Sequence, residues 1–409
     1  MRQFFRTGLL IMLLASPWVA AFGGAPVFVR PERPLRVGVL VSLTGSWSSL
    51  GQNTVAALQI AAARLGAGPH AHGFRHRIDL EVYDTKLDPN LALAATRDLH
   101  RRGVNVIIGP QSSAEVAMIK PFADAHHILV ISQGSTASSL AIAGDNIFRV
   151  CPDDAREGAA MVALMWHDGI RTLVPLWRND AGNNGLHDSV QQDFQNLGGT
   201  VTAGYRYEPT TTDFSAAIAA VSAQVATARG TSSAASIGIY LAAFDEVVGV
   251  FHSAQSDATL STTNWYGSDG VALSAALLGD SEAAAFANLV DYPNPIFGLD
   301  DALKSRWQPV ANRIMARTGI DPDAYALSAY DALFVVDRAF HTPGAQVDFH
   351  FFKSAFVATA DSYSGVTGSM ALDTAGDRAS ADFDFWAIRQ ESSLYQWVRV
   401  GGYKNGTLF

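Results

Sequence analysis

The chain has 409 residues, which is enough for two to three domains of ordinary size. With 48% hydrophobic and 16% charged residues, its composition is typical of a packed globular protein and excludes a long disordered tail. The formal net charge is −9 and the pI is about 5.6, so the chain lacks the basic excess of a nucleic-acid-binding protein.

Residues 1–21 have the pattern of a secretory signal peptide. Arg2 and Arg6 precede an apolar run at 8–14, and the small residues at 19–21 suit cleavage. The apolar run is short for a membrane span, and Pro17 interrupts it. We therefore expect export to the periplasm through a cleaved signal peptide. A retained membrane anchor is the alternative.

Cys151 is the only cysteine, so no internal disulfide can form. It lies far from the N-terminus and therefore offers no lipid attachment point there. A secreted chain without such an anchor indicates a Gram-negative periplasm. Cys151 follows a predicted strand, and we expect a buried small hydrophobe rather than a reactive thiol.

Strands and helices alternate along the first part of the mature chain. The predicted elements are a buried strand at 35–43, an Ala-rich helix at 54–65, a strand at 78–83 and a helix at 90–102. Asp88 and Pro89 supply a cap and a first-turn proline for the last of these helices. Two more strand–helix units end near residue 150. Such alternation with short links predicts a parallel, doubly wound sheet.

A second set of elements repeats this architecture without repeating the sequence. It comprises strands at 172–177, 200–207, 236–242 and 264–267, and helices at 187–197, 214–228 and 246–254. The Pro- and Asp-rich segment 291–297 is predicted to cross back. Helices at 303–318 and 323–340 are assigned to the first lobe, and late strands at 369–372 and 382–388 to the second.

The predicted fold is therefore α/β, with two doubly wound parallel-sheet lobes joined by a hinge of three crossing segments. Lobe 1 is predicted to comprise residues 34–150 and 292–362. Lobe 2 is predicted to comprise residues 151–291 and 363–409.

Polar residues and glycines follow three short apolar strands of the first lobe, at 106–108, 128–131 and 147–150. They are Ser112 and Ser113, then Gly134, Ser135 and Thr136, then Asp153 and Asp154. Small ligands bind at the carboxyl ends of the strands of an open parallel sheet, so we expect these residues to gather at one rim. Hydroxyls, free N–H groups and a carboxylate suit a zwitterion with an acid at one end and an amine at the other.

A series of segments, in order and spacing, resembles the type I periplasmic binding proteins. Within them the chain is most similar to the leucine/isoleucine/valine-binding proteins that serve ABC importers. The segments are RVGVLVSLTGSWSSLGQ, YDTKLDP, IIGPQSSAEV, ISQGSTAS, FRVCPDDAREG, WYGSDGV, YALSAYDAL and GSMALDTAGDR. The resemblance spans nearly the whole mature chain and implies a non-enzymatic receptor that closes two lobes over a small amino acid or related zwitterion.

The resemblance also implies roles for single residues. In the family, a serine and a threonine at the positions of Ser113 and Thr136 hold the ligand carboxylate, with backbone help at Gly134. An aspartate at the position of Asp154 takes the ammonium, and Asp269 stands where the family has a glutamate with the same task. Two family tyrosines that close over the ligand are replaced here by Gly182 and Phe244, and Trp47 follows the first strand as a further candidate wall.

Each of these residues also has a purely structural interpretation. Ser113 and Thr136 could cap helices, and Asp154 could be a first-turn acid, although Asp153 suits that role better. Asp269 beside Gly270 could be a turn residue. Trp47, Phe244 and Tyr266 could belong to the core.

We expect no catalytic residue, cofactor or metal ion. His70, His72 and His76 lie in a Gly- and Pro-containing stretch without cysteine or carboxylate partners, so they are predicted to be solvated. No Gly-Lys-Ser/Thr follows the turn at 45–51, and Ser46, Ser48 and Ser112 lack a nucleophile elbow. The expected partners of a monomer are a small ligand and a membrane ABC permease, not nucleic acid. The alternatives are an amide-, urea- or carboxylate-binding sensor subunit and, less favoured, an enzyme.

Overall fold

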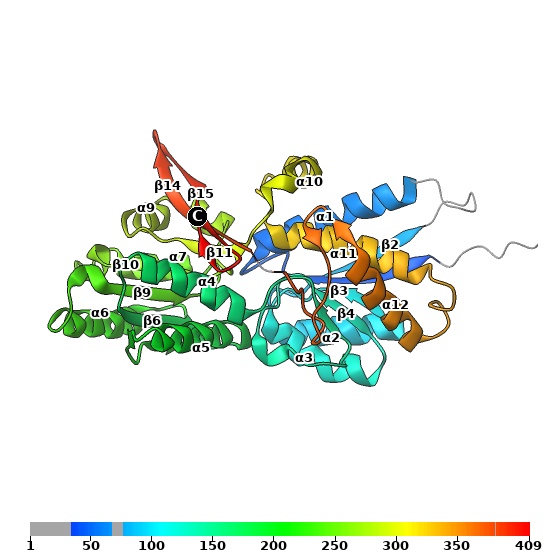
Figure 1. The fold of residues 1–409 in the computed structure, drawn as a ribbon, viewed down its shortest axis with the longest axis horizontal. Coiled ribbons are helices and arrows are strands. Elements are labelled where there is room, and N and C mark those ends of the chain that lie inside the picture. The colour runs from blue at the N-terminus through cyan, green and yellow to red at the C-terminus, as the bar shows by residue number, and fades with distance from the viewer. Residues whose placement is uncertain (1–33, 68–76, 381) are drawn as a thin grey trace, which may run out of the picture. The chain divides into compact units, whose positions relative to one another are not determined.

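The computed structural model describes residues 34–67, 77–380 and 382–409, which form one compact unit from Pro34 to Phe409 (Figure 1). The predicted signal peptide and His70, His72 and His76 lie outside the described residues.

The first parallel sheet is built from the amino-terminal part of the described chain. Its strands in spatial order are β2 (Ile78–Asp84), β1 (Leu35–Val41), β3 (Val106–Ile108), β4 (Leu129–Ser132) and β5 (Ile147–Arg149). Because side chains alternate along a strand, Val39 of β1 joins the core on one face and Leu40 the core on the other. The helices of one face are α1 (Ser48–Ala67), α10 (Lys304–Thr318), α11 (Ala324–Phe340) and α12 (Phe349–Ser362), and those of the other are α2 (Pro89–Arg101) and α3 (Ser113–Ala125).

The second parallel sheet follows the same plan. Its strands in spatial order are β10 (Asn264–Tyr266), β9 (Ile237–Ala242), β6 (Thr172–Arg178) and β7 (Thr200–Val201), and β8 (Tyr205–Tyr207) also pairs with β6. One face packs on α4 (Asp154–His167) and α5 (Ala181–Asn196), and the other on α6 (Ser215–Arg229), α7 (Val247–Ala254), α8 (Ala275–Gly279) and α9 (Ser281–Leu289). The predicted α/β class with two parallel sheets is confirmed.

A third, antiparallel sheet was not predicted as such. It contains β11 (Asn294–Phe297), β14 (Phe383–Glu391), β15 (Leu394–Lys404) and β16 (Thr407–Leu408). The predicted crossing segment 291–297 thus carries a strand, and β11 contacts both α4 and α11. The remaining short elements are β12 (Ser364–Gly365), β13 (Gly368–Ser369), η1 (Ser138–Leu140), η2 (Ala234–Ser236), η3 (Leu260–Thr262) and η4 (Asp301–Leu303).

Most predicted strands appear within a few residues of their expected bounds. The helices predicted at 54–65 and 187–197 begin about six residues earlier, as α1 and α5, and α9, α12 and β15 were not predicted. Two predicted strands also differ. The strand predicted at 200–207 is broken into β7 and β8 because Gly204 adopts φ +62°. The Gln224 side chain forms hydrogen bonds with both backbone groups of this glycine, accepting from its N–H at 2.8 Å and donating to its carbonyl at 3.0 Å. The strand predicted at 369–372 is reduced to β13 and one isolated bridge at Leu372. The predicted lobe boundaries stay a prediction.

Candidate functional site

A small cavity lies where carboxyl ends of strands from both parallel sheets meet. It is lined by Trp47, Ser112, Ser113, Gly134, Thr136, Gly182, Asn183, Leu186, Phe244 and Asp269. These residues follow β1, β3, β4, β6, β9 and β10, so they lie at the carboxyl ends of the strands. Of the residues expected at the rim of the first lobe, Ser112, Ser113, Gly134 and Thr136 line the cavity, whereas Ser135, Asp153 and Asp154 do not. Of the seven predicted site residues, only Asp154 does not line this cavity.

Ser113 is free of the capping role considered for it. Its neighbour Ser112 caps α3, and Ser112 Oγ accepts from the Glu115 N–H at 3.3 Å while Glu115 Oε2 accepts from the Ser112 N–H at 3.1 Å. Ser113 Oγ instead accepts from the Ser135 hydroxyl at 3.1 Å and from the N–H groups of Thr136 at 3.2 Å and Ala137 at 3.1 Å. The Ser113 hydroxyl proton has no acceptor among the described residues. A donor is therefore available at the cavity wall.

Thr136 does not cap a helix either. The following 3-10 helix η1 begins after Ala137 and has no side-chain cap, while the Thr136 carbonyl accepts from the Asp154 N–H at 2.8 Å. Thr136 thus belongs to a short loop, residues 135–137, that connects the end of β4 to the start of α4. The capping interpretation is wrong for both Ser113 and Thr136.

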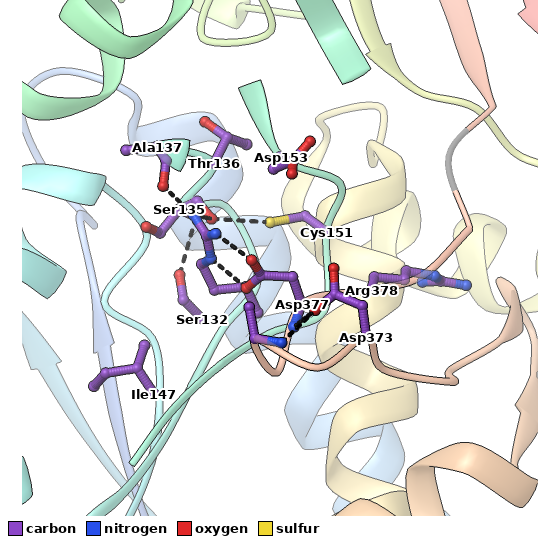
Figure 2. A network of polar contacts seen from close by, with 12 residues as sticks. Ser132, Ser135, Thr136, Ala137, Ile147, Cys151, Asp153, Asp373, Asp377 and Arg378 are labelled. Atoms are coloured by element: carbon purple, nitrogen blue, oxygen red, sulfur yellow. Dashed lines mark hydrogen bonds and ion pairs between the residues drawn. The ribbon is translucent and has the colours of Figure 1, made fainter. Parts of the chain in front are cut away.

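A buried ion pair holds the loop at residues 135–137 in place. Arg149 of β5 forms a bidentate pair with Asp377, and both residues are almost fully buried. The Arg149 guanidinium also donates to the Ala137 carbonyl at 2.6 Å. Figure 2 shows Ser135 and Ala137 of the loop in one polar network with Asp377 and Cys151. The position of Thr136 in the cavity wall therefore depends on Asp377, far along the chain.

Cys151 supports the same loop and matches the predicted buried hydrophobe. It is 1% exposed, and its thiol donates to the Ser135 carbonyl at 3.3 Å. Burial raises the pKa of the Cys151 thiol well above its usual value, so the reactive thiolate is disfavoured.

Asp154 lies at the start of α4, beside the cavity. Asp153 caps this helix by accepting from the Arg156 N–H at 3.1 Å, as the sequence suggested, so Asp154 has no capping role. Asp154 is fully buried, and neither carboxylate oxygen accepts a hydrogen bond of good geometry among the described residues. A Cβ added to Gly185 would lie 2.2 Å from Asp154 Oδ2, so the carboxylate packs directly on the backbone of α5. Burial raises the pKa of Asp154 well above its usual range, the Thr136 side chain opposes this rise, and the nearby Asp269 adds to it.

Glu157 joins the two acids and was missed by the sequence reasoning. It lies one turn beyond Asp154 on α4, is 1% exposed, and its Oε1 accepts from the Asp269 backbone N–H at 3.1 Å. Its other oxygen has no partner among the described residues. Burial raises the pKa of Glu157 well above its usual value, with further contributions from the charges of Asp269 and Asp154. The three-residue spacing from Asp154 on one helix face was the available signal.

Asp269 is the acid of this group that faces the cavity. Its Oδ2 accepts from the Tyr325 hydroxyl at 2.9 Å, and it is 4% exposed. Burial raises the pKa of Asp269 to about 6, while the Tyr325 hydrogen bond opposes the rise. Buried carboxyl groups so close together favour either protonation or a cation between them.

Aromatic rings from the two sheets meet at the opposite wall. Trp47 and Phe244 have ring centroids 4.8 Å apart, and Tyr325 meets Trp47 edge-on at 6.5 Å. The Trp47 backbone adopts φ +57°, which is strained for a bulky residue, and its N–H donates to Asp245 Oδ2 at 2.7 Å. Trp47 and Phe244 are 5% and 7% exposed, so they are cavity wall and core at once.

Gly182 packs close to Ser113. An added Cβ would meet Ser113 Oγ at 3.5 Å, which is an ordinary contact. Beside it, Asp180 caps α5 by accepting from the Asn183 N–H at 2.9 Å and pairs with Arg178 at 2.7 Å. The position at which the family resemblance implies a tyrosine thus faces the candidate hydroxyl.

Two negative observations complete the site. Among the described residues, no group of three or more His, Cys, Asp or Glu side chains is arranged to hold a metal ion. Within the same part of the chain, no helix combines the length and the apolar character of a membrane span.

The sequence pattern of the periplasmic binding proteins matches residues 34–392, which is most of the chain. The chain belongs to the periplasmic binding protein family. An uncharacterized protein of Methanocaldococcus jannaschii is 26% identical over 395 residues, covering 92% of this chain and 91% of that protein. The Leu/Ile/Val-binding protein BraC3 of Rhizobium johnstonii is 22% identical over 393 residues, covering 94% and 96% of the two chains.

Solved structures share the fold of this periplasmic binding protein at lower identity. The leucine binding protein LivK of Thermotoga maritima matches with a TM-score of 0.70 and 20% identity, covering 91% of this chain and 99% of its own. A solute binding protein of R. palustris in complex with benzoate matches with a TM-score of 0.69 and 18% identity, covering 90% and 96%. The family assignment makes this protein a solute-binding protein, and members of the family act outside the cytoplasm.

Proposed function

We propose that the protein captures an amino acid or related small zwitterion in this cavity and delivers it to a membrane ABC permease. The observation that carries the proposal is that hydrogen-bond donors and a buried acid line one small cavity. Ser113 offers a hydroxyl proton without an acceptor, and the buried acid Asp269 faces the same space. One end of the cavity therefore suits a carboxylate and the other an ammonium.

The carboxylate end is formed by the loop after β4 and the first turn of α3. The Ser113 hydroxyl, the Thr136 side chain and backbone N–H groups at the start of a helix are all donors, and such groups bind anions. Each hydrogen bond to a charged ligand group contributes about 1.5–3 kcal/mol net. A few such bonds account for micromolar affinity, about −8 kcal/mol.

The ammonium end is formed by Asp269, with Asp154 and Glu157 behind it. All three are buried, and the positive charge of Arg149 is already paired with Asp377. Burial raises the pKa values of Asp154 and Glu157, and neighbouring carboxylate charges add to the rise, so an ammonium group nearby would favour the ionised forms. Asp154 would then act on the ligand by charge or after rearrangement, since it does not line the cavity.

A carboxylate without an amine is a second candidate ligand. The pKa of about 6 for Asp269 means that this acid can be neutral in mildly acidic surroundings and needs no cation there. The benzoate complex of the R. palustris protein shows that this fold can bind an aromatic carboxylate. In this alternative, Ser113 still binds the ligand carboxylate, but Asp269 binds no ammonium group.

The experiment that tests the proposal is a thermal-shift screen followed by calorimetry. A ligand that binds only the folded protein raises its melting temperature. Amino acids should score above the matched amides, which lack the carboxylate, and above the matched acids, which lack the amine. Equal binding of an amino acid and its deaminated analogue would refute the ammonium end and favour the carboxylate reading.

Selectivity follows from the departure at Gly182 and Phe244. Burying an aliphatic side chain is worth about 1.5–3 kcal/mol, so loss of an aromatic wall weakens the preference for small branched side chains. Asn183 lines the cavity next to Gly182 and offers a polar partner in place of the aromatic wall. We expect leucine, isoleucine and valine not to be the tightest ligands in the same panel. A panel that leucine wins would overturn this expectation.

A further inference from the structure

A second hollow, of about 640 Å³, lies among α1, α10 and α11 and the segment that follows α12. It shares no lining residue with the candidate ligand cavity. Its walls carry four arginines, Arg64, Arg306, Arg313 and Arg338, and no aspartate or glutamate lines it. In a chain with a formal net charge of −9, this is a local reversal of sign.

The four guanidinium groups are not neutralised by the protein. All four residues are exposed, and among the described residues none of them forms a salt bridge. By contrast, Arg149 and Arg178 are paired with carboxylates. Helix α10 adds to the effect because its 15 residues contain one lysine and three arginines but no acid.

Neutral groups contact three of these four arginines. Arg64 Nη1 donates to the Tyr330 hydroxyl at 3.0 Å, and Arg306 Nη1 donates to Ser364 Oγ at 3.3 Å. The Arg338 guanidinium lies 4.8 Å from the centre of the Tyr363 ring. Each guanidinium has five N–H donors, so most of them remain available after these contacts.

The Asp331 carboxylate holds the segment 364–367, which forms one side of the hollow. Asp331 accepts from the N–H groups of Val366 at 2.9 Å and Thr367 at 2.8 Å, and from the Thr367 hydroxyl at 2.6 Å. These bonds set the segment 364–367 that closes one side of the hollow. The Asp331 charge is therefore satisfied by the segment and does not pair with the arginines.

We propose that this hollow binds a small multivalent anion that bears phosphate groups. Guanidinium forks match the oxygens of phosphate in pairs, and four of them around one hollow match a ligand with several negative charges. Phe334 and Tyr363 are half-buried in the wall of the hollow and offer an apolar contact to an organic body attached to the phosphate. The ligand source is either a soluble phosphate ester or a phospholipid headgroup, since both present the same chemistry. This site is independent of the proposed amino-acid cavity.

The test uses the mature protein with pyrophosphate as the soluble probe and phosphatidylcholine vesicles with or without phosphatidylglycerol as the lipid probe. Calorimetry and vesicle flotation measure the two arms. The test variant is R306Q/R313Q, and the matched control is K304Q/R317Q, which removes two charges from the same helix outside the hollow. Circular dichroism and melting temperature confirm that both variants are folded.

We expect R306Q/R313Q to weaken binding of the positive probe about tenfold or more, because two charge-assisted contacts are lost. The control K304Q/R317Q should keep its affinity, and amino-acid binding should be unchanged in both variants. Binding of pyrophosphate identifies a soluble ligand, and flotation with phosphatidylglycerol alone identifies a headgroup. Absence of binding in both arms, or equal loss in the control, overturns the proposal.

Discussion

Ser112 and Ser113 are neighbours in the sequence, yet their hydroxyl groups have different partners. Ser112 Oγ accepts a hydrogen bond in the capping box of α3, whereas Ser113 Oγ accepts hydrogen bonds from N–H groups of the loop after β4. The sequence pattern Ser-Ser before a helix cannot decide which serine caps. The adjacent pair therefore supplies its own matched control for a binding experiment.

The first prediction concerns these two serines. Ser113→Ala should weaken binding of the amino acid found by the screen by about 1.5–3 kcal/mol, because a hydrogen bond to the carboxylate is lost. Ser112→Ala should lower the unfolding free energy by about 1 kcal/mol and weaken binding less than Ser113→Ala, because the Ser112 hydroxyl is engaged in the capping box. Calorimetry and urea denaturation measure the two effects. Equal sensitivity of the amino acid and its amide to Ser113→Ala would contradict a carboxylate contact.

The second prediction concerns the pH dependence that Asp269 imposes. Burial raises its pKa from 3.8 to about 6, so its contribution to stability is fully present below 3.8 and is lost as the pH rises through 6. The raised pKa values of Asp154 and Glu157 act with the same sign. Affinity for an ammonium ligand should change in the opposite direction and increase from about pH 5 to about pH 7.5, because the carboxylate must be ionised to pair.

Calorimetry across this pH range measures the affinity, and Asp269→Asn provides the control. That variant should bind more weakly at neutral pH and should lose the part of the pH dependence centred near 6. An unchanged pH profile in Asp269→Asn would show that another group governs it.

At the scale of elements, the parallel sheets could be predicted because their strands and helices have local sequence signals, such as apolar runs and helix caps. The Asp88 cap with Pro89, and the Asp153 cap before α4, both appear as the sequence indicates. Long-range partners could not be predicted in this way. Arg149 and Asp377 are 228 residues apart, and nothing local marks either as half of a buried pair. Glu157 was missed for a related reason, since a glutamate on a helix is usually solvated and only the packing shows its burial.

The third prediction tests how Asp377 holds the loop at 135–137. Asp377→Asn should lower the unfolding free energy by about 3–5 kcal/mol, because Arg149 would remain buried without its partner. The loop carries Thr136 into the cavity wall, so ligand affinity should fall as well. The control is Asp79→Asn, which breaks the exposed pair with Arg77 and should cost about 0–1 kcal/mol. Denaturation with urea measures both variants, and a similar small cost in both would contradict a structural role for the buried pair.

At the scale of the whole molecule, contacts across the cavity link elements that belong to different sheets. The segment after β1 reaches the segment after β9 through the Trp47 N–H on Asp245 Oδ2 and through Ser46 Oγ, which accepts from the Asp245 N–H at 3.2 Å. Tyr325 of α11 reaches Asp269 after β10. The Trp47–Phe244 ring contact joins the same two segments. The arrangement suits a hinge motion between a closed and an open state.

The last prediction is that ligand binding shifts this protein toward the closed state. A ligand moves such an equilibrium only through its differential affinity, and a ligand that touches Ser113 on one sheet and Asp269 on the other binds the closed state better. Small-angle scattering should therefore show a smaller radius of gyration at saturation. Asp245→Asn weakens the contact with Trp47, so the unliganded variant should be more open and should bind more weakly, yet reach the same radius at saturation. The same radius with and without ligand in the unmodified protein would count against closure, because the ligand would then not shift the equilibrium between the open and closed states.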